Sequence, residues 1–398
     1  MKRFEKSFTQ QEAIPQAGID RAVEIMRSGR LHRYNTGTGE TSETALLEAE
    51  YAQYQGARYC LAVTSGGQAI QIALRAAGIR PGDRVLANAY TLAPVPGAMH
   101  AVGAVPVFVE IGHDWRTDID DLRAKAQVSG ARYMLLSHMR GHIGDMDSVR
   151  SLCEEHGIVL IEDCAHTMGA AWKERKSGNF GAVACFSTQT YKHLNSGEGG
   201  LVTTDVPQIA ARAIVLSGSY MLYERHGAAP ALDVFEEIKL DTPNCSARLD
   251  NVRAAMLRAQ LPQLDERIDR WNRRYRIVEE ALRQGAGVRV VDRPVHESYV
   301  GSSIQFHADG FPVADIPLFV SDCLARGVEL KWFGAEEPVA FTSRYDSWQY
   351  LENLPTLPQT LDALATTCDM RIPLTFSEED CRDIAEIICQ EAAKRVLH

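Results

Sequence analysis

The stretch 59-YCLAVTSGGQAIQIALRAAG-78 passes from one kind of apolar pattern to another. Residues 59–65 form a short run with β-branched and aromatic side chains, typical of a strand buried on both faces. Residues 68–78 follow a helical pattern that ends at Gly78, and glycine is a common helix stop. A strand followed at once by a helix is the repeating unit of α/β proteins.

The same alternation continues through the first half of the chain. A second helical pattern, over residues 147–157, also ends in glycine. Further apolar runs, each bounded by Gly, Pro or charge, occupy residues 85–90, 105–111, 133–139, 159–164, 183–188 and 200–204. Alternating strands and helices predict an α/β fold with a large, mostly parallel sheet flanked by helices.

After about Thr204 the strand rhythm stops. The segment 217–243 contains Gly, Pro and an acidic end, and we interpret it as a long irregular loop, a kind of segment that is more often functional than structural. The segment 248–284 is helical in pattern and heavily charged, and it predicts one long connecting helix.

The remainder of the chain indicates a smaller α/β domain. It mixes strand candidates at 287–291 and 299–306 with a helical pattern at 378–396. We therefore predict a large domain over residues 1–250, with the N-terminal segment, and a small C-terminal domain over residues 251–398 that begins with the connecting helix.

Composition excludes several classes of protein. Hydrophobic residues make up 45% of the 398 residues, which excludes a disordered chain. The net charge of −10 argues against nucleic-acid binding, and no apolar run approaches the ~20 residues of a membrane span. The N-terminus lacks the apolar core of a signal peptide, and the nine scattered cysteines never form CxxC, so we expect reduced thiols in a cytoplasmic protein.

Open α/β sheets bind ligands outside the carboxyl ends of their strands, so the residues at those ends matter most. Gly66 and Gly67 lie between a strand and a helix, where small residues let backbone N–H groups approach an anion. A phosphate is the natural ligand of such a turn. An ordinary strand-to-helix turn remains the alternative for this segment taken alone.

Two further strand ends carry ionisable side chains. Asp163 follows an apolar run and His166 lies three residues on; a buried carboxylate there needs a cationic partner, although helix capping would also explain it. Lys192 lies in a polar, Gly-rich turn, where partial desolvation would lower its pKa toward that of a nucleophile.

The i,i+4 pair His138 and His142 does not predict a metal site, because two glycines make a helix there unfavourable and no third ligand lies at a recognised spacing. A phosphate cradle, a buried Asp and a loop Lys are instead what pyridoxal phosphate needs: an anchor, a partner for the pyridine nitrogen and an amine for a Schiff base.

With these motifs, the chain resembles the DegT/DnrJ/EryC1/StrS aminotransferases, fold type I enzymes that depend on pyridoxal phosphate. The resemblance covers nearly the whole chain. It is carried in order by residues 39–74, 82–111, 141-GHIGDMD-147, 162-EDCAHTMGA-170, 186-FSTQTYKHLNSGEGGLVTTD-205, 248-RLDNVRAAM-256 and 371-RIPL-374.

The resemblance implies a role for each matching residue. Lys192 takes the position of the Schiff-base lysine, and Asp163 that of the acid that pairs with the pyridinium nitrogen. His166 stands where the family has Gln or His near the phenolic oxygen of the cofactor. Ser187 and the backbone of Gly66 and Gly67 match the phosphate contacts, although the family's usual Thr is Gly67 here.

Two positions depart from the family pattern. Leu92 falls where the family places an aromatic residue against the pyridine ring, and Tyr90 is the nearest possible substitute. Ser246, two residues before Arg248, stands where the family has an Asn that reaches the phosphate of the neighbouring subunit; Asn244 lies close by. The resemblance also implies a homodimer with active sites built from both subunits.

The activity that the resemblance implies is transamination from an amino-acid donor, L-glutamate or L-glutamine, to a keto-sugar, often linked to a nucleotide. A cyclitol or another non-sugar ketone is the alternative acceptor. Two other hypotheses fit the sequence less well. One is a regulatory module that binds the cofactor without turnover, and the other is a cysteine desulfurase that uses Cys164. Candidate substrate contacts, each weaker than the cofactor set, are Tyr220, Arg225, His226, Lys331, Trp332 and Arg344.

Overall fold

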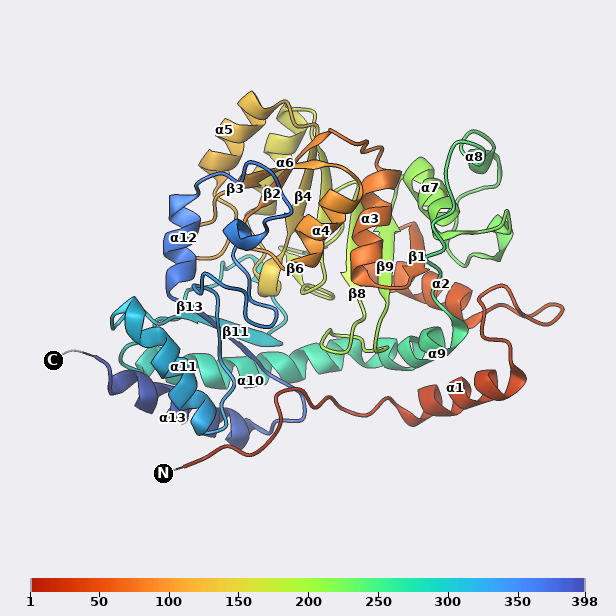
Figure 1. Ribbon diagram of the computed structural model, residues 1–398. Coiled ribbons are helices and arrows are strands. Elements are labelled where there is room, and N and C mark those ends of the chain that lie inside the picture. The colour runs from red at the N-terminus through yellow and green to blue at the C-terminus, as the bar shows by residue number, and fades with distance from the viewer. Residues whose placement is uncertain (1, 397–398) are drawn as a thin grey trace.

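The computed structural model describes residues 2–396. A large sheet with its helices lies above the long helix α10 (Leu264–Gln284) in Figure 1. A smaller sheet lies near the left-hand end of that helix. Among the described residues, no helix is both long enough and apolar enough to cross a membrane.

All seven apolar runs of the first half are strands of the large sheet, as predicted. β9 is the only antiparallel member of this sheet, running against β1 and β8, so the prediction of a mostly parallel α/β sheet is confirmed. In spatial order the strands are β1 (Tyr59–Val63), β9 (Gly200–Thr204), β8 (Val183–Ser187), β5 (Val159–Asp163), β4 (Tyr133–Ser137), β2 (Arg84–Asn88) and β3 (Val105–Val109).

Helices cover both faces of this sheet. Along β4, Leu135 joins the core on one face, and Met134 and Leu136 join the core on the other. Each such side chain stabilises the fold by roughly 1.5–3 kcal/mol when it is fully buried. Strands covered on both faces therefore have unbroken apolar sequences. One face carries α3 (Gly66–Ala76), α4 (Pro94–Ala101) and α7 (Pro207–Ser217); the other carries α2 (Glu43–Gln55), α5 (Ile119–Ser129) and α6 (Met146–Glu155).

The prediction of one continuous helix over 248–284 is wrong. The segment forms α9 (Asn251–Gln260) and α10, separated by a 3₁₀ turn over Leu261–Gln263. Pro262 lies in this turn, and proline lacks the N–H and the space that a continuing helix requires. Asp250 caps α9 by accepting a hydrogen bond from the N–H of Arg253.

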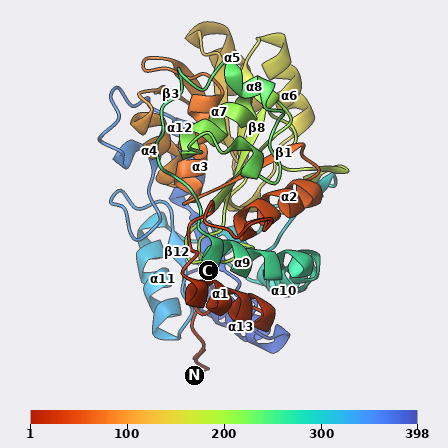
Figure 2. The ribbon, with the colours of Figure 1, turned by 90° about the vertical axis from the view of Figure 1, so that its right-hand side faces the viewer.

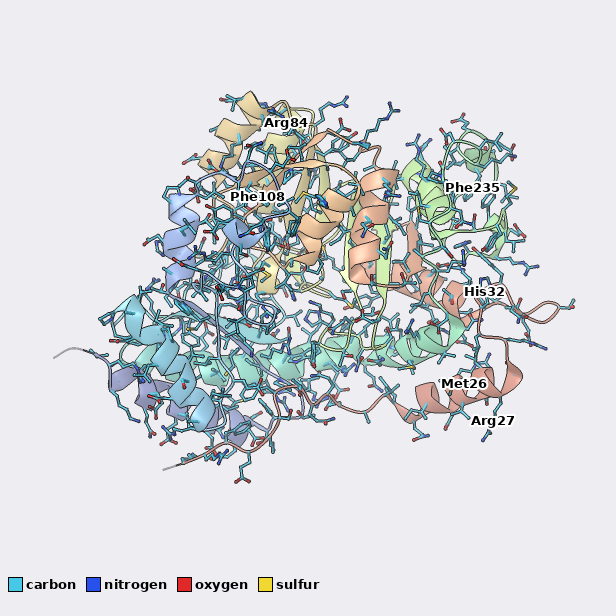
Figure 3. All side chains as sticks on the ribbon, in the orientation of Figure 1. Met26, Arg27, His32, Arg84, Phe108 and Phe235 are labelled. Atoms are coloured by element: carbon cyan, nitrogen blue, oxygen red, sulfur yellow. The ribbon has the colours of Figure 1, made fainter. Side chains whose placement is uncertain are left out.

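The segment 217–243 is more ordered than the predicted irregular loop. It contains the 3₁₀ turn η2 (Tyr223–Arg225) and the short helix α8 (Asp233–Glu236). The ring of Phe235, labelled in Figure 3, is fully buried and stacks on Tyr223 with the ring centroids 4.0 Å apart. The stacked pair belongs to the core on the α7 face of the large sheet, a contact that the Gly and Pro content did not indicate.

The small sheet comes from the second half of the chain, in the order β11 (Ser303–His307), β13 (Thr367–Arg371) and β12 (Lys331–Trp332). The helices α11 (Ile316–Ala325) and α13 (Glu378–Ala393) pack against it. The predicted strand at 287–291 is wrong, since only a single bridge from Arg289 to His307 forms there. The candidate at 299–306 is a strand only from Ser303 onward.

The N-terminal segment reaches the small sheet. Phe4 and Phe8 pack edge-on against Phe376 in the core beneath that sheet. The helix α1 (Gln16–Ser28) then lies beside α9 (Figure 2), with Met26 and Arg27 on its outer side (Figure 3). The segment that we predicted with the large domain thus also packs on the C-terminal part of the chain.

The remaining elements are short. They include a small three-stranded sheet, the short helix α12 and several 3₁₀ turns. These elements are β6 (Ala171–Trp172), β7 (Arg175–Lys176), β10 (Glu297–Ser298), α12 (Pro358–Ala365), η1 (Met139–Gly141), η4 (Val313–Asp315) and η5 (Tyr345–Ser347).

Candidate active site

A pocket opens at the carboxyl ends of the parallel strands, where the topology of the sheet predicts a ligand site. Ser137 ends β4, Asp163 ends β5 and Ser187 ends β8, and all three line this pocket. Seven of the residues singled out from the sequence lie in its wall: Gly66, Gly67, Leu92, Asp163, His166, Ser187 and Lys192.

The N-terminus of α3 forms one end of the pocket. Ser65 caps this helix by accepting a hydrogen bond from the N–H of Gln68 at 3.1 Å. A Cβ on Gly66 would lie 2.7 Å from Cβ of Ser187, closer than real Cβ atoms approach. Glycine at position 66 thus brings the first turn of the helix, with its free N–H groups and positive dipole end, against the Ser187 hydroxyl. This combination suits an anion such as a phosphate.

Asp163 is a buried carboxylate fixed by two donors. The hydroxyl of Ser137 donates to its Oδ2 at 2.8 Å, and the N–H of Ala165 donates to its Oδ1 at 3.1 Å. Thr91 in turn donates to the Ser137 hydroxyl at 2.8 Å. The carboxylate is therefore held in one orientation at the pocket wall, as a group that must face a cation requires.

Ser137 and Thr91 were not singled out from the sequence. Asn88 holds Ser137 in place through a pair of hydrogen bonds: its side chain accepts the N–H of Ser137 at 2.9 Å and donates to its carbonyl at 3.0 Å. The position of Ser137 at the end of an apolar run, next to the strand that ends in Asp163, was a usable signal.

The amine of Lys192 lies 2.6 Å from Nε2 of His166. The N–H of Arg140 donates to Nδ1 of the same ring at 3.3 Å, so Nδ1 acts as an acceptor and a neutral ring carries its proton on Nε2. That proton then points at the Lys192 nitrogen, whose lone pair must accept it. The geometry fits a neutral amine beside a neutral imidazole.

The electrostatics of the pocket agree with this arrangement. Burial, followed by the positive charge of Arg140, lowers the pKa of Lys192 from 10.5 to about 7, although Asp163 acts in the opposite direction. Burial and the nearby Lys192 and Arg140 hold the pKa of His166 well below 6.5. A lysine in this state is a nucleophile near neutral pH.

Leu92 and Tyr90 occupy different surroundings. Leu92 lines the pocket with Gly67 and Pro94. Tyr90 is buried behind it and packs edge-on against Phe333 with the ring centroids 5.1 Å apart. Its hydroxyl has no hydrogen-bond partner among residues 2–396.

Ser246 lies outside this pocket, on the exposed surface. It has a left-handed backbone with φ of 53°, and its hydroxyl accepts a hydrogen bond from Arg248 at 2.8 Å. Asn244 accepts the N–H of Ser246 at 2.9 Å. The guanidinium of Arg248 lies over the exposed ring of Tyr220, 4.8 Å from its centroid. These residues form one surface cluster.

The other candidate substrate residues also lie away from the pocket wall. Arg225 donates to the carbonyl of Tyr34 at 3.0 Å. His226 is buried, with Nε2 2.7 Å from the Tyr34 hydroxyl and Nδ1 3.3 Å from the Glu48 carboxylate. Trp332 donates to the carbonyl of Ala365 at 2.8 Å, beside Lys331 on β12. Arg344 pairs with its neighbour Asp346.

One buried group has the side chains of a metal site. Ligand atoms of His138, Glu162 and Cys164 lie within 4.8 Å of one another. The two oxygens of Glu162, however, accept the N–H groups of Gly178, Phe180 and Gly181 at 2.7–2.9 Å, in addition to contacting His138. This carboxylate anchors the turn before β8, a structural role that accounts for its burial.

The fold and the lysine pocket define the structural class of the protein as that of the α/β aminotransferases. Its chain superposes on the crystal structure of DesV from S. venezuelae with a TM-score of 0.79 and 26% identity, covering 94% of each chain. The chain belongs to the DegT/DnrJ/EryC1/StrS aminotransferase family, whose model matches residues 15–388.

Two curated relatives show the range of this likeness. A dTDP-3-amino-3,4,6-trideoxy-alpha-D-glucose transaminase from Streptomyces venezuelae is 36% identical over 63% of this chain. An L-glutamine:2-deoxy-scyllo-inosose aminotransferase from Streptoalloteichus tenebrarius is 32% identical over 62% of this chain. The chain spans 62% and 58% of the lengths of these two relatives.

Proposed function

We propose that the protein is a pyridoxal-phosphate-dependent aminotransferase whose reactive amine is Lys192. The observation that carries the proposal is the 2.6 Å contact between the Lys192 amine and His166, in a pocket that also holds Asp163 and the N-terminus of α3. A lysine kept neutral, a fixed carboxylate and an anion cradle are the three groups that this cofactor requires.

The residues present fit the cofactor. The close approach of Gly66 to Ser187 supports a phosphate held by the α3 backbone and the Ser187 hydroxyl. Asp163, fixed by Ser137 and Ala165, would face the pyridine nitrogen, and His166 and Leu92 would contact the ring. When bound, pyridoxal phosphate supplies an electron sink for the carbanion at the substrate carbon.

The chain's own residues would then handle protons and orientation. Lys192, once its amine is free, removes the proton from Cα of the amino donor and acts as the general base at a pKa near neutral. His166 orients that amine through Nε2, and its Nδ1 is held by the Arg140 backbone. The donor leaves as a 2-oxo acid whose new carbonyl oxygen comes from water, and its amino group passes to the carbonyl carbon of the acceptor, whose oxygen leaves as water.

A keto-sugar, free or linked to a nucleotide, is the acceptor that we propose, with L-glutamate or L-glutamine as donor. The deoxysugar transaminase of S. venezuelae supports the sugar. The relative that is named for 2-deoxy-scyllo-inosose supports a cyclitol as the second candidate. We also propose a homodimer in which the Ser246 cluster faces the cofactor phosphate of the second subunit.

Half-reactions test the proposed function. Purified protein loaded with pyridoxal phosphate is mixed with L-glutamate or L-glutamine, and the loss of its visible absorbance band is followed. The aminated protein is then offered keto-sugars, cyclitols and other ketones, and return of the band reports the acceptor. Stable cofactor binding with no half-reaction for any amino donor would support the regulatory alternative instead.

A further inference from the structure

Arg140 is a buried arginine whose guanidinium is incompletely satisfied. It follows β4 with a left-handed backbone, φ 54° and ψ 23°, and its side chain is only 6% exposed. The guanidinium Nε has no hydrogen-bond partner within residues 2–396. Non-glycine residues rarely adopt this backbone, and they persist in it where the surrounding structure enforces it.

One ion pair balances Arg140 only in part. Its Nη2 lies 2.9 Å from Oδ2 of Asp369 on β13, but in the described chain neither atom makes a well-aligned hydrogen bond. The other carboxylate oxygen of Asp369 accepts a hydrogen bond from Gln305 at 2.6 Å. The carboxylate is thus shared, and part of the Arg140 donor set is left unused.

A second guanidinium approaches from the same strand. Arg371, at the end of β13, lies 4.0 Å from the ring centroid of Tyr191, the residue before Lys192. Phe341 contacts both arginines, with its centroid 4.4 Å from Arg140 and 4.9 Å from Arg371. Cation–π contacts hold guanidinium groups while leaving their N–H edges free for an anion.

Two positive charges, those of Arg140 and Arg371, lie near Lys192. Asp369 pairs with Arg140, while Asp163 acts on Lys192 and Glu329 acts on Arg371. Burial and both arginines lower the pKa of Lys192, and burial followed by Arg140 lowers the pKa of Arg371. Buried guanidinium donors without partners are costly, and a bound anion would satisfy them.

We infer that Arg140 and Arg371 form a receptor for a substrate carboxylate beside Lys192. The guanidinium fork matches a carboxylate in shape, and its unused donors can bind the carboxylate oxygens. The inference rests on the proposed function, because it names the chemical group of a substrate that reacts at Lys192. The carboxylate belongs either to the amino donor or to the acceptor.

Paired substrates that differ by one charge test the receptor and its source. On the donor side, holoenzyme half-reactions compare L-glutamate with L-isoglutamine, in which the α-carboxylate is an amide. On the acceptor side, the aminated enzyme is offered 3-oxocyclohexanecarboxylate or cyclohexanone. Arg140→Gln and Arg371→Gln are measured with both pairs. Arg382→Gln, on the exposed face of α13, serves as the matched control.

We expect each variant to lower kcat/KM by at least tenfold for the member of one pair that carries the additional carboxylate, and to leave the member that lacks it within about threefold. If a variant no longer prefers L-glutamate over L-isoglutamine, the receptor binds the carboxylate of the amino donor. If it no longer prefers 3-oxocyclohexanecarboxylate over cyclohexanone, the receptor binds a carboxylate of the acceptor. Unchanged preferences in both variants, or an equal loss for both members of a pair, would overturn the inference.

Binding of glutarate, an unreactive dicarboxylate, separates this inference from the proposed function. Calorimetry on the holoenzyme should give a Kd at least tenfold weaker in Arg140→Gln and Arg371→Gln than in the wild type and in Arg382→Gln. Arg371→Lys keeps the charge and is expected to fall between them. If the wild type binds glutarate and the variants bind it equally well, the receptor is excluded even where transamination is intact.

Discussion

Two groups of side chains next to Lys192 differ in how fully their hydrogen bonds are satisfied. On the proposed cofactor side, Asp163 and Ser187 end neighbouring parallel strands, and Ser137 and Ala165 hold the Asp163 carboxylate in one orientation. On the other side, Arg140 and Arg371 contact Phe341, and Arg140 has donors without partners among residues 2–396. The first group is fixed by the protein before any ligand binds, whereas the second has donors that a ligand can satisfy. A fixed cofactor and an exchangeable substrate call for this difference.

The largest expected effect comes from removing the amine between the two sides. Lys192→Ala should lower the rate of each half-reaction by roughly 10²–10⁴-fold, because no other group described at the pocket replaces the base. Lys239→Ala, which removes a half-buried amine paired with Glu236 after α8, is the control and should retain wild-type rates. Transamination by Lys192→Ala at near wild-type rate would refute the assignment of the base.

A pair of glycine variants tests the cofactor side. In Gly66→Ala the new Cβ would lie 2.7 Å from Ser187 Cβ, and in Gly67→Ala it would meet nothing closer than 3.9 Å. Overpacking costs about 1–3 kcal/mol, so Gly66→Ala should weaken pyridoxal phosphate binding roughly 10–100-fold. Gly67→Ala should bind within about threefold of the wild type. Equal affinities for the two variants, measured by fluorescence titration, would argue against the cradle.

The pH dependence of reconstitution reports the charge of Lys192. The neutral amine is the reactive form, and it predominates above its pKa of about 7. The rate at which apoprotein takes up pyridoxal phosphate should therefore rise roughly tenfold from pH 6 to pH 8 and level off above pH 8. A rate that still rises tenfold per pH unit between pH 8 and pH 9 would show an ordinary lysine.

The smallest expected effect comes from the ring between the two arginines. Phe341→Ala removes two cation–π contacts, each worth about 0.5–2 kcal/mol. The KM for the carboxylate-bearing substrate should rise by roughly 3–10-fold, and the Kd for pyridoxal phosphate should not change. A shift of the cofactor Kd without a shift of KM would mean that the two sides are not independent.

The proposed cofactor side was the part of the site that local sequence pattern could predict. Asp163 and Ser187 each end an apolar run, and parallel strands bring such ends together. Arg140 and Arg371 were missed because they meet through the pairing of β13 in a second sheet and through one left-handed residue after β4. No short-range pattern encodes either contact.

The same reasoning explains the errors in the fold. The periodicity of 248–284 is helical throughout, but Pro262 interrupts the hydrogen bonding and divides the segment into α9 and α10. The run 287–291 contains three β-branched valines, yet only Arg289 bridges to a neighbouring strand. Strand formation depends on a partner at the right place, which composition alone does not supply.

The central claim is that one amine, that of Lys192, joins the cofactor to the protein. Borohydride treatment of protein loaded with pyridoxal phosphate, followed by peptide mass spectrometry, tests this claim most directly. We predict that the pyridoxyl group is recovered on Lys192 and on no other lysine in more than trace amount. Recovery of the label on a different lysine, or no label on a protein that binds the cofactor, would contradict the account.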